Sequence, residues 1–411
     1  MFNLMRIAVR NVVRNKRRTV ITLLALLIGV GVMVSVRGLL NGLQASMIES
    51  VTKGQVGALQ VHRKGYLKNV LSSPLDLQVP ANEAFLKKLA AVPHVIGVAP
   101  RILFGGMINV EEETLFVMMF AVDPKREFVA LPKRRDTFSA PAQAFVTGSS
   151  DEGVVVTEEL AKGLLGTKRR DFSAPTAILA PDRDGALSAE NAKILGTMAM
   201  SAPGEKKIAL VSLALAQRLL KLQGQATEVA IAVDDLEYGP QVAADLRQLL
   251  GDTYEVHQWD EIALFFKDVV RRQEIMLSVI ASVFMILMLL GVANTMLMSV
   301  LERTREIGTM MAVGVRRSKI IGLFLLEALT IGVLGGLVGG AVGLGVVTYM
   351  GLHPLHIALP TSPVPFVVVP FIGMGYIASV VAIAGVGALF FALYPAWRAS
   401  RLRPVEALAG G

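Results

Sequence analysis

The chain has 411 residues, of which 53% are hydrophobic, and a mean hydropathy of +0.55. This composition is too apolar for an ordinary soluble protein, so membrane spans have to be considered first. The net charge of +8 would otherwise suggest nucleic-acid binding, but the basic residues gather beside apolar segments, where they set membrane topology. We therefore expect no nucleic-acid partner. The chain has no cysteine, which excludes disulfides as a source of stability.

Four apolar runs are long enough to cross a membrane, for which a helix needs about 20 residues. They cover residues 19–36, 275–301, 320–350 and 367–397. The first run is longer than the apolar core of a signal peptide, and no small-residue cleavage site follows it. A spanning helix is therefore the better interpretation of that run.

Lysine and arginine gather in the leader before residue 19, in the segment 302–319 and in the tail after residue 397. Cytoplasmic flanks collect basic residues, so we expect both termini and the segment 302–319 in the cytoplasm. The long stretch 44–270 then lies outside. These three flanks carry more positive charge than the whole chain, which makes the charge a topological signal.

The long external stretch alternates between strand and helix patterns. A strand pattern turns into an amphipathic helix pattern at 153–166 and again at 207–224, and an alternating strand follows at 227–235. An α+β domain is expected from this alternation. Two polar, turn-rich segments, 125–150 and 180–193, are interpreted as surface loops.

The sequence lacks the common catalytic motifs. The P-loop that cradles nucleotide phosphates is absent, as are the Gly-x-Ser-x-Gly and His-Glu-x-x-His patterns. His353 and His356 have a proline between them and no third ligand nearby, which favours a plain loop over a metal site. We therefore expect no catalytic residue, no metal and no cofactor bound by this chain.

Polar residues also occur within or beside the expected spans. Glu327 lies about two turns into the third span, where an ionised carboxylate is expensive. A role in moving protons or substrate competes with pairing to Arg303 or Lys319, or with reaching the interface. Asn294 is interpreted as a polar contact between helices. Arg37 ends the first span and is expected at the outer headgroup level.

Glycines recur every three or four residues along the third span, at Gly332, Gly336, Gly340 and Gly343. A face of this kind lets another helix approach closely. Either a helix of the same chain or a second subunit is expected to pack there.

The charged segment 302–319 contains Gly308 and Gly314 and many Glu and Arg residues. It is expected to form a short helix along the membrane surface with one apolar side. That side would carry Ile307, Met310, Met311 and Val313. Such a helix either docks into another protein or merely fixes the topology.

Recognisable family segments then narrow these alternatives. NTMLMSVLERTREIGTMMAVGVRRSKI, residues 294–320, resembles the hallmark segment of FtsX-like ABC transporter permeases, which include macrolide exporters and lipoprotein-releasing permeases. The tail YPAWRASRLRPVEAL and the piece GVVVTEELAKGL resemble further family segments. VSLALAQRLLKLQGQATEVAIAV, with WDEI at 259–262, is similar to the lipoprotein-releasing branch. The resemblance covers nearly the whole chain.

The resemblance implies an α-helical membrane protein with four transmembrane helices and a large external α+β (periplasmic core) domain inserted between helices 1 and 2. In this family the segment matching 302–317 is the coupling helix, which docks into a separate cytoplasmic ATPase. ATP and Mg²⁺ would be bound by that partner, and this chain would be a non-enzymatic permease of the bacterial inner membrane. The residues expected to dock are Glu302, Arg303, Arg305, Glu306, Gly308 and Gly314.

The leader independently predicts a helix lying in the inner-leaflet interface, because its apolar and arginine residues occupy adjoining faces. The full expected organisation is a cytoplasmic interfacial helix at 1–18, TM1 and a stalk at 19–43, the periplasmic α+β domain at 44–270, TM2 at 271–301, the coupling helix at 302–319, TM3 at 320–350, a periplasmic loop at 351–366, TM4 at 367–397 and a cytoplasmic tail at 398–411.

The resemblance also implies a complex of two permease chains, identical or homologous, and two ATPases. ATP-driven motion would pass through the coupling helix and the spans to the periplasmic domains, an action called mechanotransmission. The expected outcome is release of lipoproteins from the inner membrane to a periplasmic carrier, with acyl chains entering between the first spans of two protomers. Two alternatives stay open: export of a drug, peptide or other amphiphile with a periplasmic adaptor, and non-transporting control of a cell-wall hydrolase.

Overall fold

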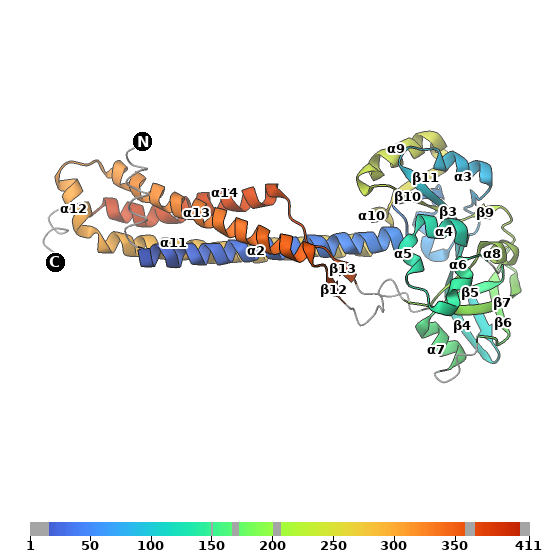
Figure 1. Cartoon of the computed structure of the whole chain (residues 1–411). Coiled ribbons are helices and arrows are strands. Elements are labelled where there is room, and N and C mark those ends of the chain that lie inside the picture. The colour runs from blue at the N-terminus through green and yellow to red at the C-terminus, as the bar shows by residue number, and fades with distance from the viewer. Residues whose placement is uncertain (1–15, 149–150, 167–171, 200–206, 358–365, 403–411) are drawn as a thin grey trace. The chain divides into compact units, whose positions relative to one another are not determined.

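The computed structural model describes residues 16–148, 151–166, 172–199, 207–357 and 366–402 (Figure 1). The chain divides into two compact units. The membrane unit comprises Met1–Ala45, Val270–Leu355 and Val367–Gly411, and the sheet unit comprises Ser46–Val269 and His356–Phe366. The leader expected as an interfacial helix and most of the tail lie outside the described residues.

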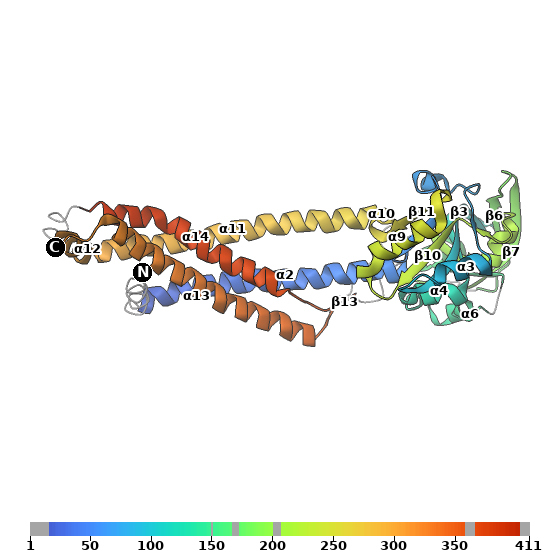
Figure 2. The ribbon, with the colours of Figure 1, turned by 90° about the horizontal axis from the view of Figure 1, so that it is seen from above.

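Among the described residues, four helices are long and apolar enough to cross a membrane. They are α2 (Lys16–Gly54), α11 (Leu264–Glu302), α13 (Arg317–Leu352) and α14 (Met374–Ser400). Within the membrane unit, α13 and α14 pack along one another (Figure 2). The expected four spans, with an α+β domain between the first and the second, are confirmed.

The helix boundaries differ from the predicted ones. α11 begins at Leu264 rather than at residue 271. α2 continues without a break through Gly54, well past the apolar run that predicted it. The fourth helix begins at Met374 rather than at residue 367, because Pro370 has no N–H and disfavours helical geometry in the residue before it. Short strands β12 (Leu355–Ile357) and β13 (Phe366–Val368) lie between α13 and α14 in the chain.

A nine-stranded sheet forms the centre of the sheet unit, in the order β11-β1-β10-β3-β4-β8-β5-β7-β6. Its strands are β1 (Leu59–Arg63), β3 (Val95–Val110), β4 (Glu113–Val122), β5 (Gly153–Thr157), β6 (Thr176–Pro181), β7 (Leu187–Met198), β8 (Ile208–Ser212), β10 (Glu228–Val233) and β11 (Tyr254–Gln258). β2 (Val79–Pro80) pairs separately with β9 (Gln225–Ala226).

The long strand β3 belongs to two halves of this sheet. Its second part also pairs with β6, at Met107 to Val110, so the strands β3-β4-β8-β5-β7-β6 close into a ring. Ile102, Met119 and Ile178 are among the apolar side chains buried in this half. Helices α7 (Glu158–Leu165) and α8 (Leu213–Leu219) contribute to the same core.

The other half contains β11, β1, β10 and the first part of β3. Helices α3 (Glu83–Ala90) and α9 (Gly239–Leu250) cover it (Figure 1). Leu89 of α3 and Leu246 of α9 are buried in one cluster with Leu59 and Ile231 of the strands. The helical period of the apolar residues in α3 and α9 therefore places their apolar faces on the sheet.

The prediction of a surface loop is wrong for 125–150, and for 180–193 it is right about exposure but misses two strands. The first segment contains α4 (Pro124–Ala130), α5 (Pro132–Arg135), η2 (Ala140–Ala142) and α6 (Gln143–Val146). Its side chains Glu127, Leu131 and Phe145 are buried. The second segment is the hairpin of β6 and β7. The remaining short helices are η1 (Leu67–Ser72), η3 (Leu236–Tyr238), η4 (Gly251–Thr253) and α10 (Trp259–Ile262).

A buried ionic cluster explains why the charged residues of the segment 125–150 led to the prediction of a surface loop. Arg101, which has no exposed area, donates to both carboxylate oxygens of Glu127 at 2.9 and 2.7 Å and to the Gln55 carbonyl at 2.7 Å. Arg134 donates to Glu127 at 2.7 Å. Burial opposes the charge on Arg101, but Glu127 and Glu228 outweigh it and raise the pKa of its guanidinium. Glu127 and Arg134 of this segment therefore lie in the interior, paired with each other and with Arg101, whereas Lys125 and Arg135 are exposed.

Candidate functional site

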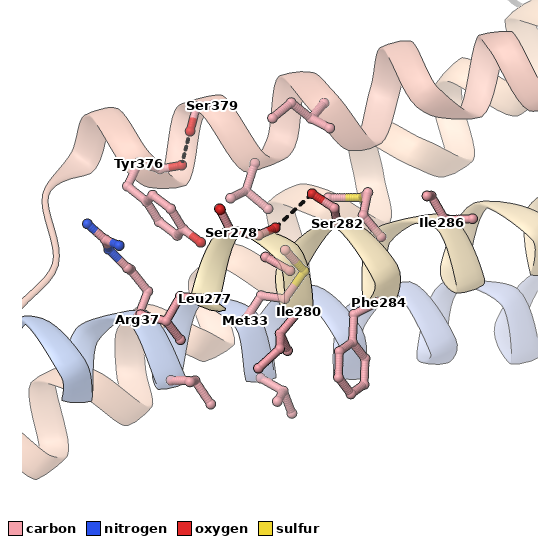
Figure 3. Close-up of a pocket in the computed structure, with 16 residues that line it drawn as sticks. Met33, Arg37, Leu277, Ser278, Ile280, Ser282, Phe284, Ile286, Tyr376 and Ser379 are labelled. Atoms are coloured by element: carbon pink, nitrogen blue, oxygen red, sulfur yellow. Dashed lines mark hydrogen bonds between the residues drawn. The ribbon is translucent and has the colours of Figure 1, made fainter. Parts of the chain in front are cut away.

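A pocket of about 460 Å³ lies within the membrane unit, between α2, α11 and α14 (Figure 3). Its lining is mostly apolar. The residues that line it are Val32, Met33, Val36 and Arg37 of α2, Leu277, Ser278, Ile280, Ala281, Ser282, Phe284, Met285 and Ile286 of α11, and Tyr376, Ser379, Val380 and Ile383 of α14. This volume falls in the range of sites for small molecules or for parts of larger ligands.

Arg37 and Tyr376 lie at one end of the pocket. The Arg37 guanidinium carbon is 5.8 Å from the centre of the Tyr376 ring, and its Nη2 is 3.9 Å from Oε1 of Glu274. Figure 3 shows both side chains beside the first turns of α14. The lining is therefore polar at this end and apolar along the rest of its length.

The serines in the lining add little polarity. Ser282 donates to the Ser278 carbonyl at 2.7 Å, Ser379 to the Tyr376 carbonyl at 2.6 Å and Ser278 to the Ile275 carbonyl at 2.7 Å. Because each hydroxyl bonds a carbonyl of its own helix, its donor is already used. Arg37 and Tyr376 supply the remaining hydrogen-bond donors of the lining side chains.

The position of Arg37 along α2 indicates the depth of the pocket. Arg37 lies 18 residues after Thr19, and at 1.5 Å per residue this places it about 27 Å along the helix, close to the roughly 30 Å of a hydrocarbon core. Glu274 and Tyr376 lie near the ends of α11 and α14 that are remote from the α11–α13 connection. The pocket therefore occupies the half of the membrane remote from that connection.

The connection between α11 and α13 contains one short helix, α12 (Thr304–Ala312). The predicted single helix over 302–319 is too long, because α11 ends at Glu302 and α13 begins at Arg317. Gly314 has a φ of +90°, a left-handed conformation that favours glycine and that turns the chain between the two helices.

The apolar side of α12 packs on the membrane helices. Ile307 is buried in one cluster with Ile320 and Phe324 of α13 and Ala396 of α14, and Met310 and Met311 pack against it. Val313, which was expected on this side, is 82% exposed, because the helix has already ended at Ala312.

Arg303 occupies the break between α11 and α12 and is only 7% exposed. Its Nη1 donates to Oε2 of Glu327 on α13 at 3.4 Å, and its Nε lies 3.3 Å from Oε2 of Glu306 on α12. Glu327 is 3% exposed. Of the two partners considered for Glu327, the structure places Arg303 beside it, while Lys319 is exposed.

The six residues expected to dock an ATPase therefore separate into two groups. Glu302, Arg305, Glu306 and Gly314 are exposed. Arg303 and Gly308 are buried against the chain's own helices. ATPase docking stays a prediction for the exposed group, whereas the buried pair contributes to the position of α12.

The glycines of α13 serve two neighbouring helices. Gly332, Gly336 and Gly340 lie against α14, and a Cβ built on Gly332 would be 2.7 Å from the Ala384 carbonyl oxygen. Gly343 instead lies against α2, where its Cβ would be 2.7 Å from Cβ of Val34. The predicted stripe therefore meets helices of the same chain.

A second glycine row was missed in the sequence. Gly335 and Gly339 face α2 together with Gly343, and a Cβ on Gly339 would be 2.9 Å from the Leu27 carbonyl oxygen. The spacing of these glycines was visible in the sequence, but only the packing assigns them to a separate face.

Asn294 is exposed on α11, whereas its neighbour Thr295 joins the helices. The Oγ1 atoms of Thr295 and Thr22 of α2 are 2.9 Å apart. In the described part of the chain, no group of three His, Asp or Glu residues is arranged to hold a metal ion.

Comparison with known families agrees with this architecture. Residues 19–249 match the family described as "MacB-like periplasmic core domain", and residues 278–404 match the family described as "FtsX-like permease C-terminal". The first match covers more than half of the chain, so the chain belongs to the family with a MacB-like periplasmic core domain. It is an ABC transporter permease of the MacB and FtsX type.

The curated relatives carry related names. The macrolide export ATP-binding/permease protein MacB of Wolinella succinogenes is 26% identical over 100% of this chain and 61% of its own length. The protein of the same name from Hyphomonas neptunium is 31% identical over 54% of this chain and 33% of its own length. The chain thus spans less than two thirds of the length of these relatives.

Among solved structures, the periplasmic region of MacB from Actinobacillus actinomycetemcomitans aligns with a TM-score of 0.37 at 9% identity. The alignment covers 51% of this chain and 92% of that one.

Proposed function

We propose that this chain is the permease subunit of an ABC transporter that releases lipoproteins from the bacterial inner membrane by mechanotransmission. A separate ATPase would bind the exposed side of α12 from the cytoplasm and supply ATP hydrolysis. A second permease chain would complete the complex, and both termini would lie in the cytoplasm. The substrate's acyl chains would enter the pocket between α2, α11 and α14.

The pocket is the observation that supports this substrate class. Its wall is apolar over most of its length, and Arg37 and Tyr376 lie at the end remote from the α11–α13 connection; with that connection in the cytoplasm, this end would face outward. A lipid anchor is likewise apolar along its acyl chains and polar at its linkage to the protein, so it would match the pocket along its length. The charged residue in the lining is Arg37, which disfavours a cationic amphiphile more than a neutral one.

The test uses the full chain with its ATPase in proteoliposomes and a fluorescent triacylated protein as probe. Ala281→Trp occupies the pocket from α11. An acyl chain that loses the burial of about two or three CH₂ groups, at about 0.8 kcal/mol each, should be released about ten- to a hundredfold less. The matched control is Ala341→Trp, on an exposed part of α13 outside the pocket. Equal release by the two variants would contradict the assignment of the pocket.

Export of a drug, peptide or other amphiphile through a periplasmic adaptor is the second candidate. It is favoured by the names of the relatives, which are macrolide export proteins. The same proteoliposomes distinguish the two candidates. ATP-dependent transport of a macrolide, without release of the triacylated protein, would replace the first proposal with the second.

A further inference from the structure

Arg303 is placed where a charged side chain is costly. Arg303 directly follows the last residue of α11 and is 7% exposed. Glu327, its partner, is 3% exposed within the candidate span of α13. Charged groups at such positions are expensive unless they are paired, and they are usually functional. Exposed basic residues such as Arg316 and Lys319 are sufficient to set the membrane topology. The buried pair therefore needs a different explanation.

The geometry of Arg303 connects three helices. Its backbone ends α11, its Nε lies 3.3 Å from the first-turn carboxylate of Glu306 on α12, and its Nη1 donates to Glu327 on α13 at 3.4 Å. One guanidinium thus bridges a residue of α12 and a residue of α13. Because the guanidinium is planar and its donors are fixed in direction, it constrains the orientation of α12 as well as its distance from α13.

Apolar packing supports the same connection. Ile307 of α12 is buried against Ile320 and Phe324 of α13, and these side chains lie within one turn or two of the ion pair in sequence. Apolar contacts are not directional, however, and permit sliding. The ion pair adds a directional contact between the start of α12 and α13.

We propose that Arg303 and Glu327 form a buried ionic link that makes α12 and α13 move as one body, so that displacement of α12 passes directly into α13. This inference rests on the proposed function, since the displacement would come from the ATPase. Arg303 and Glu327 act as positioning residues and do not touch the substrate. α13 in turn packs through its two glycine faces on α14 and on α2, both of which line the pocket.

The test replaces both partners with methionine, as Arg303→Met with Glu327→Met. Removing one member of a buried ion pair is strongly destabilising, whereas replacing both with apolar residues is often neutral. The double variant should therefore fold and keep its ATPase. Arg398→Gln, which removes an exposed arginine from the end of α14, is the control.

Two measurements are made on each protein. Because the chain has no cysteine, Thr309→Cys on α12 and Ala341→Cys on α13 accept spin labels selectively, and their distance distribution reports whether the two helices move together. The second measurement is the amount of triacylated protein released per ATP hydrolysed.

We expect one narrow distance distribution in the unsubstituted chain, unchanged between the nucleotide-free and the vanadate-trapped states. The double variant should give a broader distribution and should release about tenfold less probe per ATP, within the usual range of coupling energies. A narrow distribution in the double variant, or unchanged release per ATP, would overturn the link. If no ATPase binds the unsubstituted chain, the proposed function fails, but the distance distributions of the chain alone still decide the link.

Discussion

Arg101 and Glu127 are the most completely buried charges in the described part of the sheet unit, and the cluster around them should dominate the local stability. Breaking a buried ion pair from one side costs about 3–5 kcal/mol. Arg101→Met should therefore destabilise the sheet unit by that amount, since Glu127 loses its bidentate partner and the Gln55 carbonyl loses its donor. Pulse proteolysis of the full chain in urea measures the change.

Arg126→Met is the matched control for this prediction. Arg126 pairs with Glu83 at the surface, where its side chain is 31% exposed, and exposed pairs contribute only about 0–1 kcal/mol. If both variants lost the same stability, the buried cluster would have no special role.

Asp182 gives the sheet unit a predictable acid sensitivity. Lys221 Nζ lies 2.7 Å from Oδ2 of Asp182, and the Asp184 and Ala186 amides donate to its Oδ1 at 2.9 and 3.0 Å. The Lys221 ammonium, more than these amides, holds the pKa of the Asp182 carboxyl below its usual value. A lowered pKa in the folded state means stability that is present above about pH 3.9 and is lost as the pH falls through the folded-state pKa.

Asp182→Asn should therefore speed amide hydrogen exchange in the β6–β7 hairpin at neutral pH, and this difference from the unsubstituted chain should shrink near pH 3. Mass spectrometry with exchange times corrected for pH makes the comparison. Asp184→Asn is the control, because that side chain is 71% exposed and lies 3.7 Å from Lys221. A difference that is equally large at both pH values would contradict the assignment.

Single residues were predictable where the sequence offered a local partner. Arg303 could be named in advance as one of two candidate partners of Glu327, because both residues lie near the same end of their spans. Arg101, Glu127 and Arg134 could not, since charged residues are usually exposed and Arg101 lies 26 residues before its partner Glu127. The segment 125–150 was misassigned for this reason.

At the scale of elements, the glycine faces of α13 should determine how closely the membrane helices approach. Gly332→Ala places a Cβ 2.7 Å from a backbone oxygen of α14, and overpacking of this kind costs about 1–3 kcal/mol. The thermal unfolding midpoint of the full chain in one detergent should fall accordingly.

Gly345→Ala is the matched control on the same helix, since a Cβ there would meet no atom within 4 Å. Alanine is favoured over glycine in a helix by about 0.5–1 kcal/mol, so this variant should be as stable as the unsubstituted chain or slightly more stable. A fall in the midpoint as large as that of Gly332→Ala would show that close packing is not the cause.

Elements were predictable where a single period or a long apolar run defined them. The strand-to-helix changes at β5–α7 and β8–α8 and the four spans follow this rule. Boundaries set by turns were not predictable from hydropathy. The start of α14 depends on Pro370, and the end of α12 precedes a left-handed Gly314.

At the scale of the whole molecule, hydropathy and charge predicted four spans with a large inserted domain, and the resemblance of single segments implied a permease. The structure and the family comparison agree with both. The ring closed by β3 and β6 could not be predicted, because pairing between distant strands depends on the complete set of tertiary contacts. The pocket between α2, α11 and α14 could not be predicted either, because its lining residues come from three separate parts of the sequence.

The central claim is that an ATPase drives this permease to release lipidated proteins. The most direct measurement is purification of the protein from its native membrane in mild detergent, with identification of the associated chains and their lipid modifications by mass spectrometry. We predict an ABC ATPase together with acylated proteins. Recovery without any ATPase would contradict the account, and an ATPase with a periplasmic adaptor but no acylated protein would contradict lipoprotein release.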